Sequence, residues 1–298
     1  MTAHLTTIAR ARRGFGRVLA LALTAVLAAC VISPGTAEAA GERIVTLGAN
    51  LSAAQRSEML SLFKVKEGEV PILSVTNAEE REYLTGVVPS QQIGTRAISS
   101  VFVRVKDDGS GIKVQTKNIT YVTERTYANA LVTAGISGAD IYAAAPFPVS
   151  GTAALTGVFK AFEEVTGEDI PEEAKRIATE ELVETSEIGE QVGDPAAIAE
   201  LVRLAKEEVV RRGLDDPVAI RAVVVEIAIR LDIELTDTQI DSLVELLIMI
   251  GSLDLDLDTI QKQLKDFQDS IGLTDEQARG IWKAISDFFV GIWRAIFG

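Results

Sequence analysis

A single junction between a strand-like and a helix-like segment, at residues 139–162, constrains the fold of this chain most strongly. Asp140–Ala145 is typical of a short buried strand, and Pro146 and Pro148 are expected to end it, because proline cannot donate to a sheet ladder. Small residues at 150–152 then predict the start of a helix. Before this junction the sequence alternates between strand and helix patterns, and after it the pattern is helical throughout.

The segment 42–167 predicts one mixed α/β domain in the order β-α-β-α-β-β-α-β-α, with helices on at least one face of the sheet. A capping box at Ser52 and Gln55 predicts the first helix. The aspartates and glycines at 107–111 are typical of a hairpin turn, so 95–106 and 112–119 are expected to pair. The strands are expected at 42–47, 70–75, 95–106, 112–119 and 140–145, and the helices at about 52–64, 78–84, 124–133 and 152–166.

The segment 168–298 predicts a helical domain of about six helices. One helix is expected from Pro171 to about Ser186, followed by a short linker that ends at Gly193. Two Asp-Pro pairs, 194–195 and 216–217, each supply an N-cap aspartate and a proline at the first helical position. Capping boxes beginning at Thr236 and Thr274 predict two further helices.

The first 39 residues have the pattern of a secretory signal peptide. Four arginines at 10–17 precede Val18–Ile32, a run of 15 residues without acid or base, shorter than the ~20 needed to span a bilayer. Ala37-Glu38-Ala39 is a small-x-small cleavage pattern, so we expect cleavage near Ala39 and a secreted or envelope-associated protein. The alternative is a lipoprotein box at 27–30, in which Cys30 becomes the lipidated first residue.

Composition limits the chemistry that the mature chain can perform. His4 and Cys30 are the single histidine and cysteine, and both precede the expected cleavage site. We therefore expect no disulfide, no catalysis by His or Cys, no histidine-held metal and no cofactor. Cleavage also removes four arginines and one glutamate, which takes the net charge from −14 to −17. This charge disfavours nucleic acid as a partner, and the oligomeric state stays open.

Two strand-to-helix turns are candidates for holding a ligand. Gly48 and Asn50 follow the first strand, and Ser150, Gly151 and Thr152 follow the last. Helix N-termini at such turns present free backbone N–H groups, and turns of this kind in α/β sheets tend to share one edge. The alternative is ordinary turn chemistry, since no nucleotide-binding motif accompanies either turn. No catalytic residue is assigned.

Two features of the helical domain have competing interpretations. Asp254, Asp256 and Asp258 have the spacing that begins an EF-hand loop, but Thr259 and Lys265 replace its defining Gly and Glu. We therefore expect the polar edge and N-cap of a helix whose leucines are buried, with no metal site, and a weak Ca²⁺ site is the alternative. The last helix has a wide apolar face that includes Trp282, Phe289 and Trp293. This face is expected either to contact a membrane or partner, or to pack as the last core helix or a homodimer seam.

Several sequence blocks resemble a bacterial exported family known as domain of unknown function 1002. The first block is Arg43–Leu51, and the inner blocks are Asn118–Thr123, Tyr127–Ala130 and Ala144–Gly157. The resemblance implies a secreted protein, mostly of Gram-positive bacteria, and it supplies no activity and no catalytic residues.

These observations favour an exported cell-envelope protein with a non-enzymatic binding or structural role, for which cell wall and membrane surfaces are the expected partners. The alternative is a hydrolase or ligand-binding enzyme that needs neither His nor Cys, with its site at the strand-to-helix edge.

Overall fold

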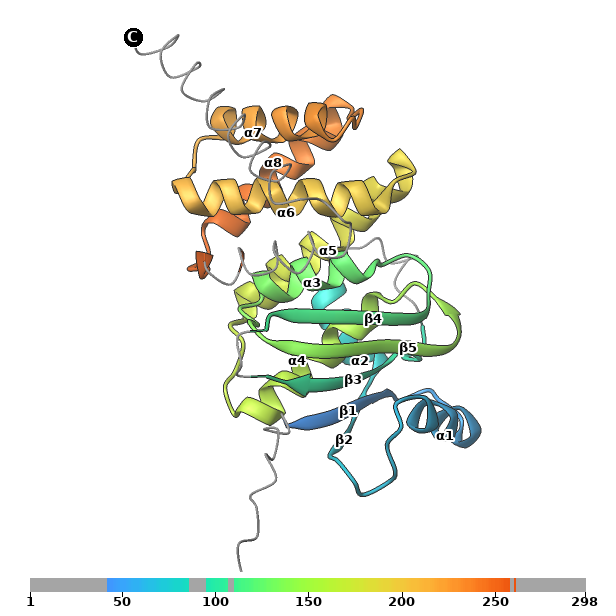
Figure 1. Cartoon of the computed structure of the whole chain (residues 1–298). Helices are drawn as coiled ribbons and strands as arrows, with labels where there is room; N and C mark the ends of the chain where they lie inside the picture. The colour runs from blue at the N-terminus through green and yellow to red at the C-terminus, as the bar shows by residue number, and fades with distance from the viewer. Residues whose placement is uncertain (1–41, 86–94, 107–109, 258–259, 261–298) are drawn as a thin grey trace, which may run out of the picture. The chain divides into compact units, whose positions relative to one another are not determined.

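A computed structural model describes residues 42–85, 95–106, 110–257 and 260 of the chain (Figure 1). It confirms a mixed sheet with covering helices followed by a helical region. The elements are β1 (Arg43–Gly48), α1 (Ala53–Leu62), β2 (Ile72–Val75), α2 (Asn77–Leu84), β3 (Ser100–Val105), β4 (Ile112–Ile119), α3 (Glu124–Thr133), β5 (Ala139–Val149), α4 (Thr152–Thr166), α5 (Glu172–Val192), α6 (Pro195–Arg212), α7 (Pro217–Arg230) and α8 (Asp237–Gly251).

The five strands form one sheet in the order β2-β1-β3-β5-β4. β1 pairs with β2 in parallel and β4 with β5 in parallel, whereas β3 is antiparallel to both β1 and β5. The predicted hairpin between 95–106 and 112–119 is wrong, because β5 lies between β3 and β4. The almost continuously apolar first half of β5 suits this interior position, whereas the exposed lysines of β4 suit an edge strand.

β5 is longer than the predicted strand and continues through both prolines to Val149. β3 pairs with β5 only as far as Ala144, and the β4–β5 register is interrupted between Lys117 and Ile119. Asn118, at a φ of 59°, sits at that interruption and donates from its side chain to the Ala145 carbonyl, over 2.8 Å. The prolines therefore fall beyond the regular ladder, where their missing N–H groups remove no sheet hydrogen bond.

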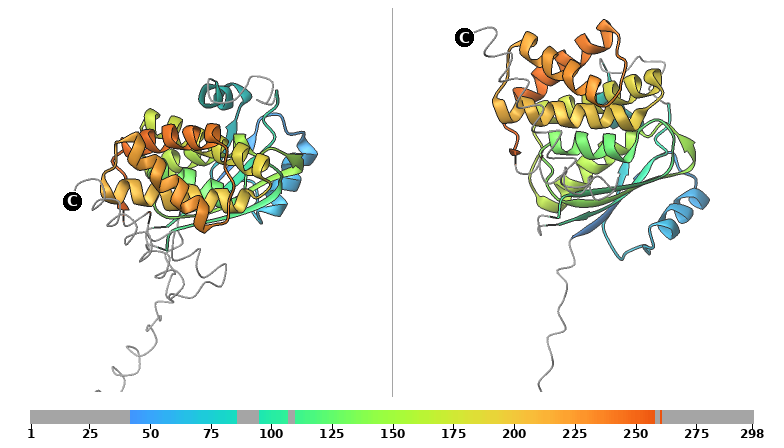
Figure 2. Two further views of the ribbon diagram at one scale, coloured as in Figure 1. Left: turned by 90° about the horizontal axis from the view of Figure 1, so that it is seen from above. Right: turned by 45° about the horizontal axis from the view of Figure 1, so that its top comes forward.

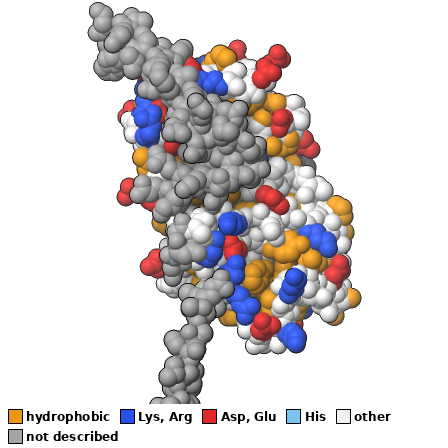
Figure 3. Space-filling model, viewed as in Figure 1, with side chains coloured by type: hydrophobic (Ala, Val, Ile, Leu, Met, Phe, Trp, Pro, Cys, Tyr) orange, Lys and Arg blue, Asp and Glu red, His pale blue; other side chains and the backbone are white. Residues whose placement is uncertain are grey.

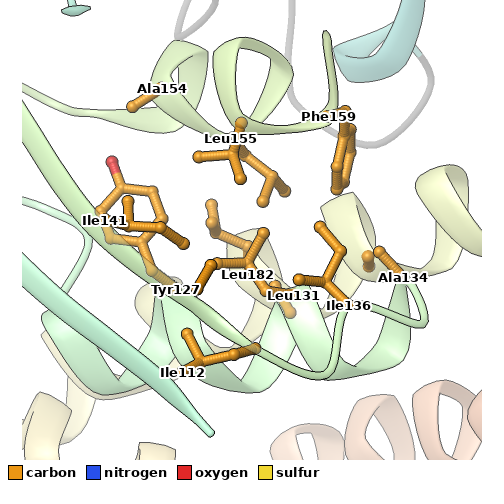
Figure 4. Packing of buried hydrophobic residues seen from close by; sticks show 14 of the residues in the cluster. Ile112, Tyr127, Leu131, Ala134, Ile136, Ile141, Ala154, Leu155, Phe159 and Leu182 are labelled. Carbon is orange, nitrogen blue, oxygen red and sulfur yellow. The ribbon is translucent and has the colours of Figure 1, made fainter. Parts of the chain in front are cut away.

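Helices α3 and α4 cover one face of the sheet, and α1 lies on the opposite face (Figure 2). Figure 4 shows the core between sheet and helices, where Tyr127 and Leu131 of α3 meet Leu155 and Phe159 of α4. Leu182 of α5 belongs to the same core. Close approach of α4 to β1 requires Gly157, since a Cβ there would lie 2.6 Å from the Thr46 hydroxyl.

The helical region continues from this core. α5 packs on α3 and α6, and α6, α7 and α8 contact one another around a second apolar core. The predicted N-caps are confirmed: Asp194 accepts from the Ala197 N–H at 2.9 Å, Asp216 from the Ala219 N–H at 3.1 Å, and Thr236 from the Gln239 N–H at 3.3 Å. The division of the chain into domains at residue 167 stays a prediction.

The predicted linker after Ser186 is wrong, because α5 continues as helix to Val192 and Gly193 caps its C-terminus at a φ of 83°. Gly189 lies inside this helix for a packing reason rather than as a helix breaker. A Cβ at Gly189 would lie 2.7 Å from the Cα of Pro195, where α6 begins. The expected helix after Thr274 lies outside the described residues.

Candidate functional site

A cavity of about 540 Å³ lies where β4 and β5 end and α4 begins. Two segments of the sheet edge form one wall, and one face of α5 forms the other. Hydroxyl groups and carboxylates line it together with an amide and a few apolar side chains. The lining residues are Thr120, Tyr121, Pro148, Val149, Ser150, Thr152, Val183, Glu187, Glu190 and Gln191. The cavity thus contains two of the predicted ligand-binding residues, Ser150 and Thr152.

The turn that carries Ser150 and Thr152 is held rigidly. Gly151 has a φ of 97°, and a Cβ on it would lie 2.4 Å from Cγ2 of Ile119 and 2.6 Å from the Tyr127 hydroxyl. The buried Tyr127 hydroxyl donates to the Gly151 carbonyl. The Ser150 carbonyl accepts from the N–H groups of Tyr121 and Val122, each at 3.3 Å. No other residue type fits at Gly151 without displacing these partners.

The Ser150 hydroxyl is not the helix cap. Gly151 occupies the N-cap position of α4, which has no side-chain cap hydrogen bond. The hydroxyl oxygens of Ser150 and Thr152 lie 3.5 Å apart and are presented at the cavity wall. A ligand can therefore use both hydroxyls at a helix N-terminus whose N–H groups are not consumed by a capping side chain.

Negative charge dominates the opposite wall. The Tyr121 hydroxyl donates to the Val183 carbonyl at 3.4 Å. Burial, reinforced by the nearby charges of Glu187, Glu190 and Glu184, raises the pKa of Tyr121 to about 12. Burial also raises the pKa of Glu184, and neighbouring carboxylates add to that rise. The phenol therefore stays neutral at physiological pH, and the rise at Glu184 reflects burial and the crowding of carboxylates along α5.

Gly48 and Asn50, the other predicted pair, lie in a different neighbourhood. A Cβ on Gly48 would lie 2.5 Å from the Ala97 carbonyl oxygen. Asn50 accepts on its side-chain oxygen from the Ala97 N–H at 2.9 Å and donates from its own N–H to the Ala97 carbonyl at 3.0 Å. Both residues fix the segment that leads into β3, and neither is among the residues lining the cavity.

The sequence does not predict five of the polar lining residues as site residues: Thr120, Tyr121, Glu187, Glu190 and Gln191. The last three were assigned to a linker, where side-chain directions are undefined. Their signal is the helical spacing of 183, 187 and 190–191, which places them on one face once α5 is known to be continuous. Gln191 donates to Glu187 at 3.2 Å, which fixes one of the two carboxylates.

The other candidate residues are only partly placed. Asp254 and Asp256 belong to the described part, but Asp258 does not, and no group of His, Cys, Asp and Glu among the described residues is arranged to hold a metal ion. Cys30, Trp282, Phe289 and Trp293 lie outside the described residues. Within the described ranges, no helix combines the length and apolarity required to cross a bilayer.

Comparison with known proteins gives a family but no activity. A family model described as a protein of unknown function (DUF1002) matches residues 47–267. The uncharacterized protein YpuA of Bacillus subtilis (strain 168) is 41% identical over 276 residues, which cover 91% of this chain and 94% of that protein. No solved structure matches. The chain therefore belongs to the DUF1002 family of proteins of unknown function.

Proposed function

We propose that this protein is exported to the cell envelope and binds a small polar ligand in the cavity at Ser150 and Thr152. The arginine-rich start, the 15-residue run without charge and the Ala37-Glu38-Ala39 pattern support export. The main support for binding is the cavity, in which the hydroxyls of the sheet edge face the carboxylates of α5. The role is binding, and no step of covalent chemistry is proposed for these residues.

The chemistry of the cavity wall selects the ligand class. Glu187 and Glu190 make no ion pair with any described residue, so their charges are available to a ligand. The hydroxyls of Ser150 and Thr152 can donate and accept, whereas the Thr120 hydroxyl donates to the Val149 carbonyl at 3.0 Å and can only accept from a ligand. A ligand with one ammonium group and several hydroxyls matches both walls, and an anion would be repelled by α5.

A matched pair of sugars tests the binding proposal. Glucosamine and glucose share ring and hydroxyls but differ in one ammonium group, so we expect glucosamine alone to raise the melting temperature of residues 40–298. Glu187→Gln with Glu190→Gln should abolish that rise. Glu164→Gln, a change of an exposed acid on α4 outside the cavity, should leave it intact. Equal responses to both sugars, or to neither, would refute an ammonium-selective cavity.

Intact mass of the protein from its native source tests export and its alternative. Cleavage after Ala39 gives an unmodified chain that begins at Ala40. Lipidation gives a heavier, acylated chain that begins at Cys30. An uncleaved chain retained in the cell would refute both forms of export.

Pelleting identifies the surface on which an exported protein works. We expect residues 40–298 to sediment with purified cell wall or with liposomes. Comparison with a chain lacking 274–298 then shows whether the apolar C-terminal segment provides the attachment. Failure to sediment with either surface would contradict an envelope role.

A further inference from the structure

Among the described elements, α1 covers only part of the sheet face opposite α3 and α4. α1 lies over β1 and one end of β3 and β5, where Phe63 packs with Val45, Leu47 and Ala144. Beside α1 no described residue covers the face, which forms a shallow depression of about 620 Å³ over β3, β4 and β5. It lies away from the residues of the proposed ligand cavity and shares none of them.

Basic residues surround this depression in a protein whose net charge is −14. Its described lining contains Lys64, Arg104, Lys106 and Lys113, with Asp140 as the acidic residue. Figure 3 shows basic side chains around a hydrophobic patch in the region where Figure 1 draws β3, β4 and β5 in front. A local excess of positive charge on an acidic protein attracts anions to that face.

The strand register sets the spacing of these charges. Asp140 of β5 is the register partner of Arg104 of β3 on one side and of Lys113 of β4 on the other. Asp140 forms ion pairs with Arg104 and with Lys106, the latter at 2.7 Å. Partial burial opposes ionisation, but hydrogen bonds from Lys106 and Arg104 hold the pKa of Asp140 below its usual value. Arg104 and Lys106 are thus pinned by one carboxylate, and Lys113 lies two strands, roughly 10 Å, from Arg104.

The depression has an aromatic wall. The Phe63 ring lies 6.3 Å from the Phe102 ring and 5.6 Å from the Tyr142 ring, the latter in an edge-to-face arrangement. Phe102 and Tyr142 are half-buried, so part of each ring still faces the depression. Such rings contact CH₂ groups and sugar faces, which are the uncharged parts of a polymer repeat.

Lys64 holds its position at a cost to the fold. It follows the last turn of α1 with a φ of 56°, a left-handed conformation that favours glycine. The N–H groups of Lys64 and Val65 bond back to Ser61 and Leu60, at 3.1 and 3.0 Å, so the helix end requires that conformation. A lysine in place of the favoured glycine points to a use for its side chain, which lines the depression.

We propose that this open sheet face binds a flexible polyanion, a chain of phosphate-linked repeats without stacked bases. The basic residues are spread over β3, β4 and the end of α1 rather than gathered into a nest, so they fit negative charges repeated along a chain. Duplex DNA is stiff over ~150 base pairs and would extend its charge over the acidic remainder of the protein.

Binding of long-chain inorganic polyphosphate to residues 40–298 at low salt tests this proposal. We expect Lys113→Glu and Lys64→Glu each to weaken binding roughly tenfold. Loss of one phosphate contact through a neutral substitution should reduce the slope of log K against log salt concentration by about 0.7. Lys66→Glu is the matched control, because it changes the charge equally, two residues from Lys64, without lining the depression. It should alter affinity less than twofold.

Lys64→Gly and Lys64→Ala separate binding from folding. Both should weaken polyphosphate binding to the same extent, but only Lys64→Gly should raise the urea midpoint, because glycine relieves the left-handed conformation. Single-stranded DNA and poly-glutamate of matched length are the competing probes. No binding of polyphosphate, an equal loss with Lys66→Glu, or tighter binding of either competing probe would overturn the proposal.

Discussion

The Nζ of Lys206 on α6 lies 2.6 Å from a carboxylate oxygen of Glu181 on α5, and both side chains are almost completely buried. Lys206 also donates to the Asn129 carbonyl at 2.8 Å and to the Thr133 hydroxyl at 2.7 Å, both on α3. Thr133 in turn donates to the second carboxylate oxygen of Glu181, at 2.5 Å. This network joins the helix layer on the sheet to the first two helices of the helical region. Burial lowers the pKa of Lys206, and Glu181 opposes that shift.

Removing one partner of this pair should destabilise the fold strongly. Lys206→Met leaves the Glu181 carboxylate buried without its cation, so we expect a loss of ~3–5 kcal/mol in the free energy of unfolding. Lys206→Met with Glu181→Met should cost less than the sum of the single variants, since no charge is then stranded. Urea unfolding measures all three variants.

An exposed pair provides the control for this cycle. Arg43→Met breaks a surface ion pair with Glu69 at 3.3 Å, and it should change the free energy of unfolding by no more than ~1 kcal/mol. Additive single variants of Lys206 and Glu181 would show that the two charges do not act as a unit.

Gly151→Ala should destabilise the protein by ~2–4 kcal/mol, because it adds the strain of a φ of 97° to a clash with Ile119 and Tyr127. Gly167→Ala is the matched control at the other end of α4. Gly167 has a φ of 69° with nothing within 4 Å, so only the conformational cost of ~1 kcal/mol is expected. Equal losses in the two variants by thermal or urea unfolding would show that the packing around Gly151 adjusts.

Local rules made much of the fold predictable. The helix at 124–133 and the capping at Ser52, Asp194, Asp216 and Thr236 depend on neighbours within four residues, and the structure has them as expected. Strand pairing depends on distant segments, and there the sequence interpretation failed. A turn-like sequence at 107–111 cannot reveal that a strand thirty residues later separates its two flanks.

The candidate site, too, has a locally determined part that the sequence predicts and a part that depends on distant segments. Ser150 and Thr152 were identified from a local junction, but the wall that faces them was not. In the fold, Gly189 lies inside α5 and permits the close approach of Pro195. Because the sequence predicts a linker that ends at Gly193, it does not place Glu187 and Glu190 on the helix face that completes the cavity.

Two isoleucines of α7, two positions apart, should differ strongly in how much stability is lost when each is truncated to alanine. Ile227 is 2% exposed in the helical core, so Ile227→Ala should cost ~2–4 kcal/mol. Ile229 is 73% exposed, so Ile229→Ala should change the free energy of unfolding by no more than ~0.5 kcal/mol. Urea unfolding of residues 40–298 measures both. A large loss for Ile229→Ala would mean that another part of the chain or a second copy covers this face of α7.

The stability of the protein should fall between about pH 4.5 and pH 7 through Glu80. Its side chain is buried on α2, with one oxygen accepting from Asn77 at 3.2 Å. Burial raises the pKa of Glu80 from 4.5 to about 7, a rise that the Asn77 hydrogen bond opposes. The unfolded chain releases this proton near pH 4.5, whereas the folded protein keeps it until about pH 7. The contribution of Glu80 to the free energy of unfolding therefore decreases as pH rises through that window and is constant above it.

Glu80→Gln removes the titration and keeps the shape of the side chain. We expect the variant to be more stable than the parent by ~1–2 kcal/mol at pH 8, after allowance for solvent screening, and unchanged at pH 4. Urea unfolding at the two pH values measures the difference. Glu82→Gln, at an exposed position of the same helix, should give no such pH-dependent gain. A gain of the same size at pH 4 and pH 8 would assign the effect to packing rather than to the buried charge.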